Sequence, residues 1–179
     1  NGSTSSNAGS SNSSSSNAYV SQASLSNYSD TAVYAANKIL PSIVGIQVEY
    51  TSSSLISMFG SNGQNITSTA SGSGIIISDD GYILTNNHIV SNNSSSSNSY
   101  YNYDVSKATK IIVTLFNDDT QYDAKIVGTD EQTDLAVIKI EKTGLTAAEL
   151  GDSDTVQVGE FCMAIGNPLG LKSTVTAGI

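Results

Sequence analysis

Hydrophobic and polar residues alternate along most of the chain in short stretches, and each stretch is followed by a polar turn. Short stretches rich in Val, Ile and Tyr are typical of β-strands. Many short strands without long helical periodicity predict an all-β domain, folded as an antiparallel barrel or a sandwich. We expect these strands at residues 42–48, 74–78, 82–85, 110–116, 124–127, 135–140 and 161–165.

Two turns and one helix are expected in addition to the strands. Asp79–Gly81 lies between two expected strands and predicts a hairpin, with glycine where a positive φ is needed. Asn117–Asp119 indicates a second turn. Ahead of the strands, Ser29 or Asp30 can cap a short helix that ends before Pro41.

Long polar segments bound the folded unit. Residues 1–29 are almost entirely Ser, Asn, Gly and Ala, and such a segment buries too little apolar surface to offset its ordering entropy. We therefore expect a disordered tail or linker there, with the folded domain beginning at residue 30. Segments 51–71 and 91–107 are also polar and rich in Ser and Asn, which favours long disordered loops over functional lids.

Charge and cysteine content exclude several classes of protein. The net charge is −9 and the seven Lys and Arg residues form no cluster, which argues against a nucleic-acid partner. Cys162 is the only cysteine, so no internal disulfide can form, and its apolar neighbours predict a buried, inert thiol. No apolar run is long enough to span a membrane. The Ser/Asn tail favours an extracytoplasmic location, because such a tail remains when a signal or anchor is removed.

Two residues are candidates for catalysis. His88 is the only histidine and lies where the strand beginning at Tyr82 ends, a rim position useful to a general base. Asp134 directly precedes the apolar run 135–140 and could accept the Nδ1–H bond of His88. Each also has an ordinary structural interpretation, His88 as a packed histidine and Asp134 as a turn residue. A single histidine without a second His or Cys cannot complete a metal site.

Several motifs resemble those of the HtrA/DegP serine proteases. Residues 71–90 contain a glycine-led strand, an Asp-Gly hairpin and the element T-N-N-H-I. Residues 130–137 read D-E-Q-T-D-L-A-V, and residues 164–170 read A-I-G-N-P-L-G. These motifs stand in the order and spacing of that family. The likeness covers nearly all of the chain from residue 30 onward.

This resemblance implies a fold and a mechanism. The fold would be a chymotrypsin-like double β-barrel, with the first six-stranded antiparallel barrel at residues 30–170 and the truncated start of the second at 171–179. His88 would be the general base and Asp134 the residue that orients it. No metal or organic cofactor is implied. The family's substrates are unfolded or damaged proteins and peptides, its core is often a trimer, and a peptide-binding PDZ domain often follows the protease.

The chain departs from the family in its nucleophile. The family's G-N-S-G-G-P motif is absent from residues 1–179, so the catalytic set lacks a nucleophile and we expect no peptidase activity from this chain alone. Serines at 71, 73, 78 and 153 have structural explanations. The chain could be a piece of a longer protease, a naturally short binding protein, or half of a split protease.

Other functions remain open. A protease-like module without catalysis could bind a ligand through its cleft or through the loop Tyr100–Tyr103, although solvated loop tyrosines are the more ordinary interpretation. A cell-surface structural domain displayed on the Ser/Asn tail is a further alternative. We also expect a homo-oligomer, because an isolated first barrel exposes apolar surface. A membrane tether upstream of the chain is consistent with the tail.

Overall fold

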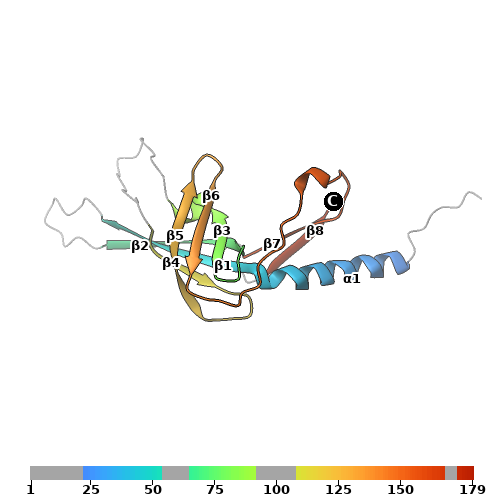
Figure 1. Cartoon of the computed structure of the whole chain (residues 1–179), viewed down its shortest axis with the longest axis horizontal. Helices are drawn as coiled ribbons and strands as arrows, with labels where there is room; N and C mark the ends of the chain where they lie inside the picture. The colour runs from blue at the N-terminus through green and yellow to red at the C-terminus, as the bar shows by residue number, and fades with distance from the viewer. Residues whose placement is uncertain (1–21, 54–64, 92–107, 168–172) are drawn as a thin grey trace, which may run out of the picture.

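The structure is a computed structural model that describes residues 22–53, 65–91, 108–167 and 173–179. A long helix leads into β-structure (Figure 1). A one-turn helix follows the third strand. Short 3-10 helices occupy Leu40–Ser42 and Ser153–Thr155. The other elements are α1 (Gln22–Ile39), β1 (Ile43–Ser53), β2 (Asn65–Ile76), β3 (Tyr82–Asn86), α2 (Asn87–Val90), β4 (Ala108–Thr114), β5 (Gln121–Asp130), β6 (Leu135–Ile140), β7 (Cys162–Gly166) and β8 (Thr174–Gly178).

Six strands close into a barrel. Their order around the barrel is β1-β2-β3-β6-β5-β4, and every neighbouring pair is antiparallel. Closure leaves no open sheet edge, because β4 pairs with β1. The predicted all-β class and six-stranded antiparallel barrel are confirmed. β7 and β8 form a separate two-stranded sheet.

The barrel core follows from the alternation of β-branched residues. In β1, Val44, Ile46 and Val48 are almost completely buried, whereas Gln47 between them is exposed. Burying each such side chain contributes about 1.5–3 kcal/mol. The buried core consists of Val44, Ile46, Val48, Tyr50, Ile76, Ile83, Val90, Ile111, Val113, Ala136, Ile138 and Ile140.

The two longest barrel strands extend into a segment expected to be a loop. β1 runs to Ser53 and β2 begins at Asn65, so the prediction of a loop over 51–71 is wrong at both of its ends. Backbone pairing continues from Gln47↔Ser71 to Ser53↔Asn65. The main chains pair here through a sequence that is rich in Ser and Thr beyond Tyr50, and its weak hydrophobic pattern gave no strand signal. The predicted loop 91–107 lies almost wholly outside the described residues.

Helix α1 is longer than its sequence signals indicate. It begins at Gln22, so the predicted caps Ser29 and Asp30 lie inside it and the final part of the expected tail is helical. The ring of Tyr28 meets that of Phe161 edge-on, with centroids 4.7 Å apart. This contact with a residue far along the chain supports the extra turns and could not be anticipated from local sequence. Neither helix in the described part of the chain is long and apolar enough to cross a membrane.

The β7–β8 hairpin corrects one expectation about the core. β7 pairs only with β8, beginning at Cys162↔Gly178, and Figure 1 shows the hairpin beside the barrel on the α1 side. Cys162 is exposed, so the prediction of a buried thiol is wrong. The apolar run 161–165 suggested a core strand. A two-stranded sheet outside the barrel has too few neighbours to cover both of its faces.

Candidate active site

The pairing of β3 with β6 brings the two candidate catalytic residues together. Asn86, the last residue of β3, lies opposite Leu135, the first residue of β6. His88 follows in α2, and Asp134 directly precedes β6. Residues 46 positions apart in the sequence therefore meet at one end of the barrel.

The side chains of His88 and Asp134 are hydrogen-bonded. His88 Nδ1 lies 2.7 Å from Asp134 Oδ2. The other carboxylate oxygen, Oδ1, accepts a hydrogen bond from the His88 main-chain N–H at 2.9 Å. One carboxylate is thus hydrogen-bonded to both the ring and the main chain of the histidine. The contact expected from the sequence is present, whereas the catalytic role of the pair stays a prediction.

Asp134 adopts a backbone conformation that few residues tolerate. Its φ is +55°, in the left-handed region, where Asp is one of the more acceptable side chains. The main chain is held there because the Asp134 carbonyl accepts hydrogen bonds from Asn87 N at 3.0 Å and Asn86 Nδ2 at 3.1 Å. Asn86 Nδ2 also lies 3.1 Å from Asp134 Oδ2. These contacts aim the carboxylate at His88.

Asn86 is the residue whose role the sequence motif did not reveal. Its amide contacts both the main chain and the side chain of Asp134, so it fixes the acceptor of the pair. The only sequence signal was the placement of two polar residues, Asn86 and Asn87, between an apolar strand and His88. That signal gives no partner, because the partner is Asp134, in the turn before β6.

The electrostatics keep Asp134 ionised. Hydrogen bonds from the main-chain N–H of His88, and then from its ring, hold the pKa of Asp134 below its ordinary value, and they outweigh the opposing effect of desolvation. Asn86 adds the smallest lowering effect. The amide of Asn86 therefore positions the carboxylate more than it acidifies it.

The ring of His88 is accessible on its other edge. Its side chain is 65% exposed, and its Nε2 makes no hydrogen bond within the part of the chain that the structure describes. An ionised Asp134 accepts from Nδ1–H, which leaves Nε2 as the proton acceptor of the neutral ring. This pair can take a proton from a group brought to Nε2 and can stabilise the resulting imidazolium.

No serine of the described residues completes this pair. Ser73 Oγ accepts a hydrogen bond from Asn167 N at 2.7 Å, and Ser78 Oγ donates to Asp80 Oδ1 at 2.5 Å. Ser153 begins a 3-10 helix. Within residues 22–53, 65–91, 108–167 and 173–179, no serine hydroxyl is hydrogen-bonded to His88. The same residues contain no group of three or more His, Cys, Asp or Glu side chains suited to a metal ion.

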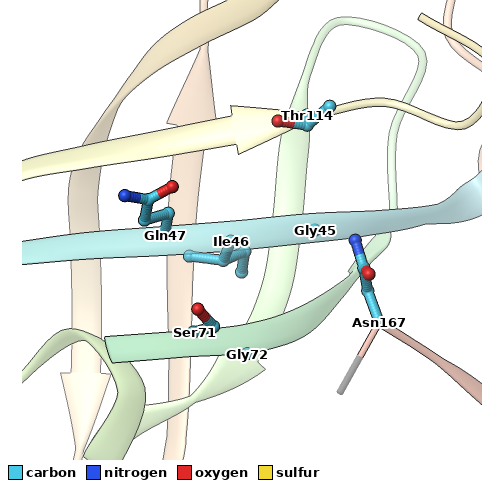
Figure 2. Close-up of a pocket in the computed structure, with 7 residues that line it drawn as sticks. All are labelled: Gly45, Ile46, Gln47, Ser71, Gly72, Thr114 and Asn167. Atoms are coloured by element: carbon cyan, nitrogen blue, oxygen red, sulfur yellow. The ribbon is translucent and has the colours of Figure 1, made fainter. Parts of the chain in front are cut away.

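A small cavity of about 120 Å³ lies where β7 ends against β1 and β2. Figure 2 shows the Asn167 amide reaching toward Gly45, where any β-carbon would overlap it. The Oδ1 atom of Asn167 is buried without a hydrogen-bond partner among the described residues. Neither His88 nor Asp134 lines the cavity.

Comparison with known proteins assigns the family. The fold and the His–Asp pair define a barrel of a trypsin-like peptidase. The trypsin-like peptidase domain family matches residues 72–179. The chain belongs to this family as an HtrA-type member.

Relatives and solved structures agree with this assignment. A probable periplasmic serine endoprotease DegP-like from Pseudomonas fulva (strain 12-X) is 42% identical over 120 residues, which cover 67% of this chain and 22% of the relative. The similarly named protein of Chlamydia trachomatis serovar D is 46% identical over 108 residues, covering 60% and 18% of the two chains. The chain therefore spans about a fifth of the length of these relatives.

A solved structure extends the likeness to three dimensions. A variant of the HtrA-type protease AlgW with decapeptide is 33% identical and superposes with a TM-score of 0.65. The match covers 82% of this chain and 44% of that chain. The resemblance seen in the motifs thus includes the course of the backbone.

Proposed function

We propose that this chain carries the proton-transferring half of an HtrA-like serine endopeptidase site. His88 is the general base and acid, and Asp134 orients it. The observation that carries this proposal is the 2.7 Å contact between His88 Nδ1 and Asp134 Oδ2, reinforced by the main-chain bond at 2.9 Å. Family membership supplies the reaction class.

The chemistry follows from the free edge of the ring. As a serine Oγ attacks the carbonyl carbon of a peptide bond, His88 Nε2 accepts the hydroxyl proton, and the imidazolium formed is stabilised by the Asp134 carboxylate. His88 then gives this proton to the departing amine, which breaks the C–N bond. The 179 residues contain no G-N-S-G-G motif, so we propose that they do not cleave peptide bonds by themselves.

We further propose that the substrates are unfolded or damaged proteins outside the cytoplasm. Support comes from the two relatives, which carry the name periplasmic serine endoprotease, and from AlgW, whose structure contains a decapeptide. An extended peptide suits a site at the open rim of a barrel, where His88 is exposed. A homo-oligomer, a trimer by analogy with the family, and an upstream membrane tether belong to the same proposal.

The decisive variant is Asp134→Asn. An amide replaces one of the two carboxylate oxygens with NH₂, so the separate acceptors for the main-chain N–H and for the ring of His88 are not both kept. An NH₂ group facing the ring favours the Nε2–H tautomer. Nitrogen-15 NMR of His88, the only histidine, should show the ring changing from the Nδ1–H to the Nε2–H tautomer. In the whole protein that the natural gene encodes, the kcat for casein cleavage should fall by a factor of about 10⁴.

Two further variants make the test specific. His88→Ala should reduce cleavage by the natural protein by about 10⁶. Asp123→Asn is the matched control, because Asp123 is an exposed carboxylate of the same barrel, 3.7 Å from Lys110, and should leave both readouts unchanged. Casein cleavage that survives His88→Ala would refute the proposal. A natural protein that binds casein without cleaving it would instead support a non-catalytic binding module.

A further inference from the structure

The one-turn helix that carries His88 is also held from inside the barrel. Tyr50 of β1 is only 4% exposed, and its hydroxyl donates a 2.7 Å hydrogen bond to the main-chain carbonyl of Ile89. Helix α2 ends at Val90, so this carbonyl belongs to the terminal set that a helix leaves without an intrahelical donor. A buried hydroxyl and an unpaired carbonyl thereby satisfy each other.

The side chain of Ile89 packs closely against β2 as well. A β-carbon at Gly72 of β2 would lie 2.8–2.9 Å from three atoms of the Ile89 side chain, so glycine permits this close approach. Ile89 is therefore fixed through its carbonyl by β1 and through its side chain by β2. It directly follows His88, so its position limits where the ring of His88 can point.

These contacts complement those of Asp134. The bonds from the carboxylate reach the main-chain N–H and Nδ1 of His88, on the N-terminal side of the short helix. A single turn of helix has little stability of its own, so its orientation depends on outside contacts. Tyr50 supplies such a contact on the C-terminal side. Burial raises the pKa of Tyr50, so its hydroxyl keeps the donated proton at neutral pH.

We propose that Tyr50 is a positioning residue for His88. It acts through the Ile89 carbonyl and holds α2 in the orientation in which Nδ1 of the ring meets Asp134. The proposal rests on the proposed function, because the orientation of the ring matters for catalysis only if His88 is the general base.

The test uses the tautomer of His88 in the nitrogen-15-labelled 179-residue chain. Tyr50→Phe removes the hydroxyl oxygen and retains the aromatic ring of residue 50. It should lower the ratio of the Nδ1–H to the Nε2–H tautomer of the neutral His88 ring by about two- to five-fold, within the range expected when one hydrogen bond is lost. Gly72→Ala, which displaces the Ile89 side chain, should act in the same direction. These two variants perturb the same helix from two different strands.

Tyr122→Phe is the matched control. The Tyr122 hydroxyl donates to Asp118 Oδ2 at 2.9 Å in the same barrel, but β5 places it at the end away from Asp130, the residue that pairs with Leu135. This variant also loses a tyrosine hydrogen bond. It should lower the urea midpoint of unfolding while leaving the His88 tautomer ratio unchanged.

The outcomes separate this inference from the proposed function. An unchanged ratio in a folded Tyr50→Phe chain overturns the role of Tyr50. An equal fall in Tyr122→Phe does so too, because the effect would then be a general loss of stability. If Asp134→Asn also leaves the ratio unchanged, the His–Asp pair itself fails and the proposed function fails with it. If Asp134→Asn changes the ratio and Tyr50→Phe does not, only the Tyr50 inference is lost.

Discussion

The turn that leads into β3 should be the most sensitive glycine position of the barrel. Gly81 has a φ of +104°, a conformation that L side chains rarely adopt, and a β-carbon there would overlap the main-chain oxygen of Ile140. That oxygen cannot easily move, because Ile140 N donates to Gly81 O at 3.1 Å and ties β6 to the turn. Gly81→Ala therefore strains the backbone and clashes with a fixed neighbour.

The magnitude follows from these two effects. Holding a non-glycine residue in a strained conformation costs about 1–3 kcal/mol, and overpacking adds about 1–3 kcal/mol. We expect a loss of about 3 kcal/mol in the free energy of unfolding, a large part of the roughly 5–15 kcal/mol typical of a domain. With a urea m-value of about 2 kcal/mol/M, the midpoint should fall by about 1.5 M.

Gly128→Ala is the matched control for this experiment. Gly128 lies in β5 with a negative φ, and a β-carbon there meets no atom within 4 Å. Alanine should be neutral there or stabilise by about 0.4–1 kcal/mol through the unfolded chain. The chain has no tryptophan, so unfolding is best followed by far-ultraviolet circular dichroism. Equal urea midpoints for Gly81→Ala and Gly128→Ala would show that the turn carries no strain.

Three further predictions concern the carboxylates and the cysteine. The pKa values of Asp118, Asp130 and Asp134 are lowered by hydrogen bonds, so the stability they contribute is complete above about pH 4, their unfolded value, and is lost as pH falls through the folded pKa values. Urea midpoints should therefore fall as the pH drops below about 4, less steeply in Asp134→Asn, and a flat profile would contradict this. Asn86→Asp places a second carboxylate beside Asp134 and should raise the pKa of Asp134, seen as a shift of its carboxyl carbon-13 titration to higher pH; an unchanged titration would argue against the Asn86 contact. Cys162 should react with a disulfide reagent in the native chain nearly as completely as in urea, whereas protection would indicate a covered β7.

Much of the barrel could be predicted from the sequence because its core strands alternate. β6 occupies the predicted range 135–140, and the Asp79–Gly81 hairpin is present with its positive-φ glycine. The strand ends at Ser53 and Asn65 were missed, because residues 51–53 and 65–69 are mostly Ser, Thr and Asn and give little hydrophobic pattern. The start of α1 was missed because a distant aromatic contact supports it. Local pattern predicts elements well where side-chain burial decides them.

In the candidate site, too, some residues could be predicted from the sequence and others could not. His88 and Asp134 were predicted because their neighbours form motifs, and the contact between them follows once β3 pairs with β6. The groups that aim the pair were not predicted. Asn86 donates to a carbonyl in the turn before β6, and Tyr50 looked like an ordinary inward residue of β1. Both roles depend on which main-chain oxygen lies within reach, a property of the closed barrel.

The buried hydroxyl of Tyr50 shows why such roles escape pattern analysis. A phenylalanine would satisfy the same alternation in β1, so burial alone does not explain a tyrosine at this position. The hydroxyl is accounted for only when the Ile89 carbonyl is found 2.7 Å away, in a helix that is too short to satisfy its own terminal carbonyls. A polar group in an apolar core costs free energy unless it is paired. Its partner here belongs to the turn that carries the only histidine, so the polar part of this core residue serves the candidate site, while its ring serves the barrel.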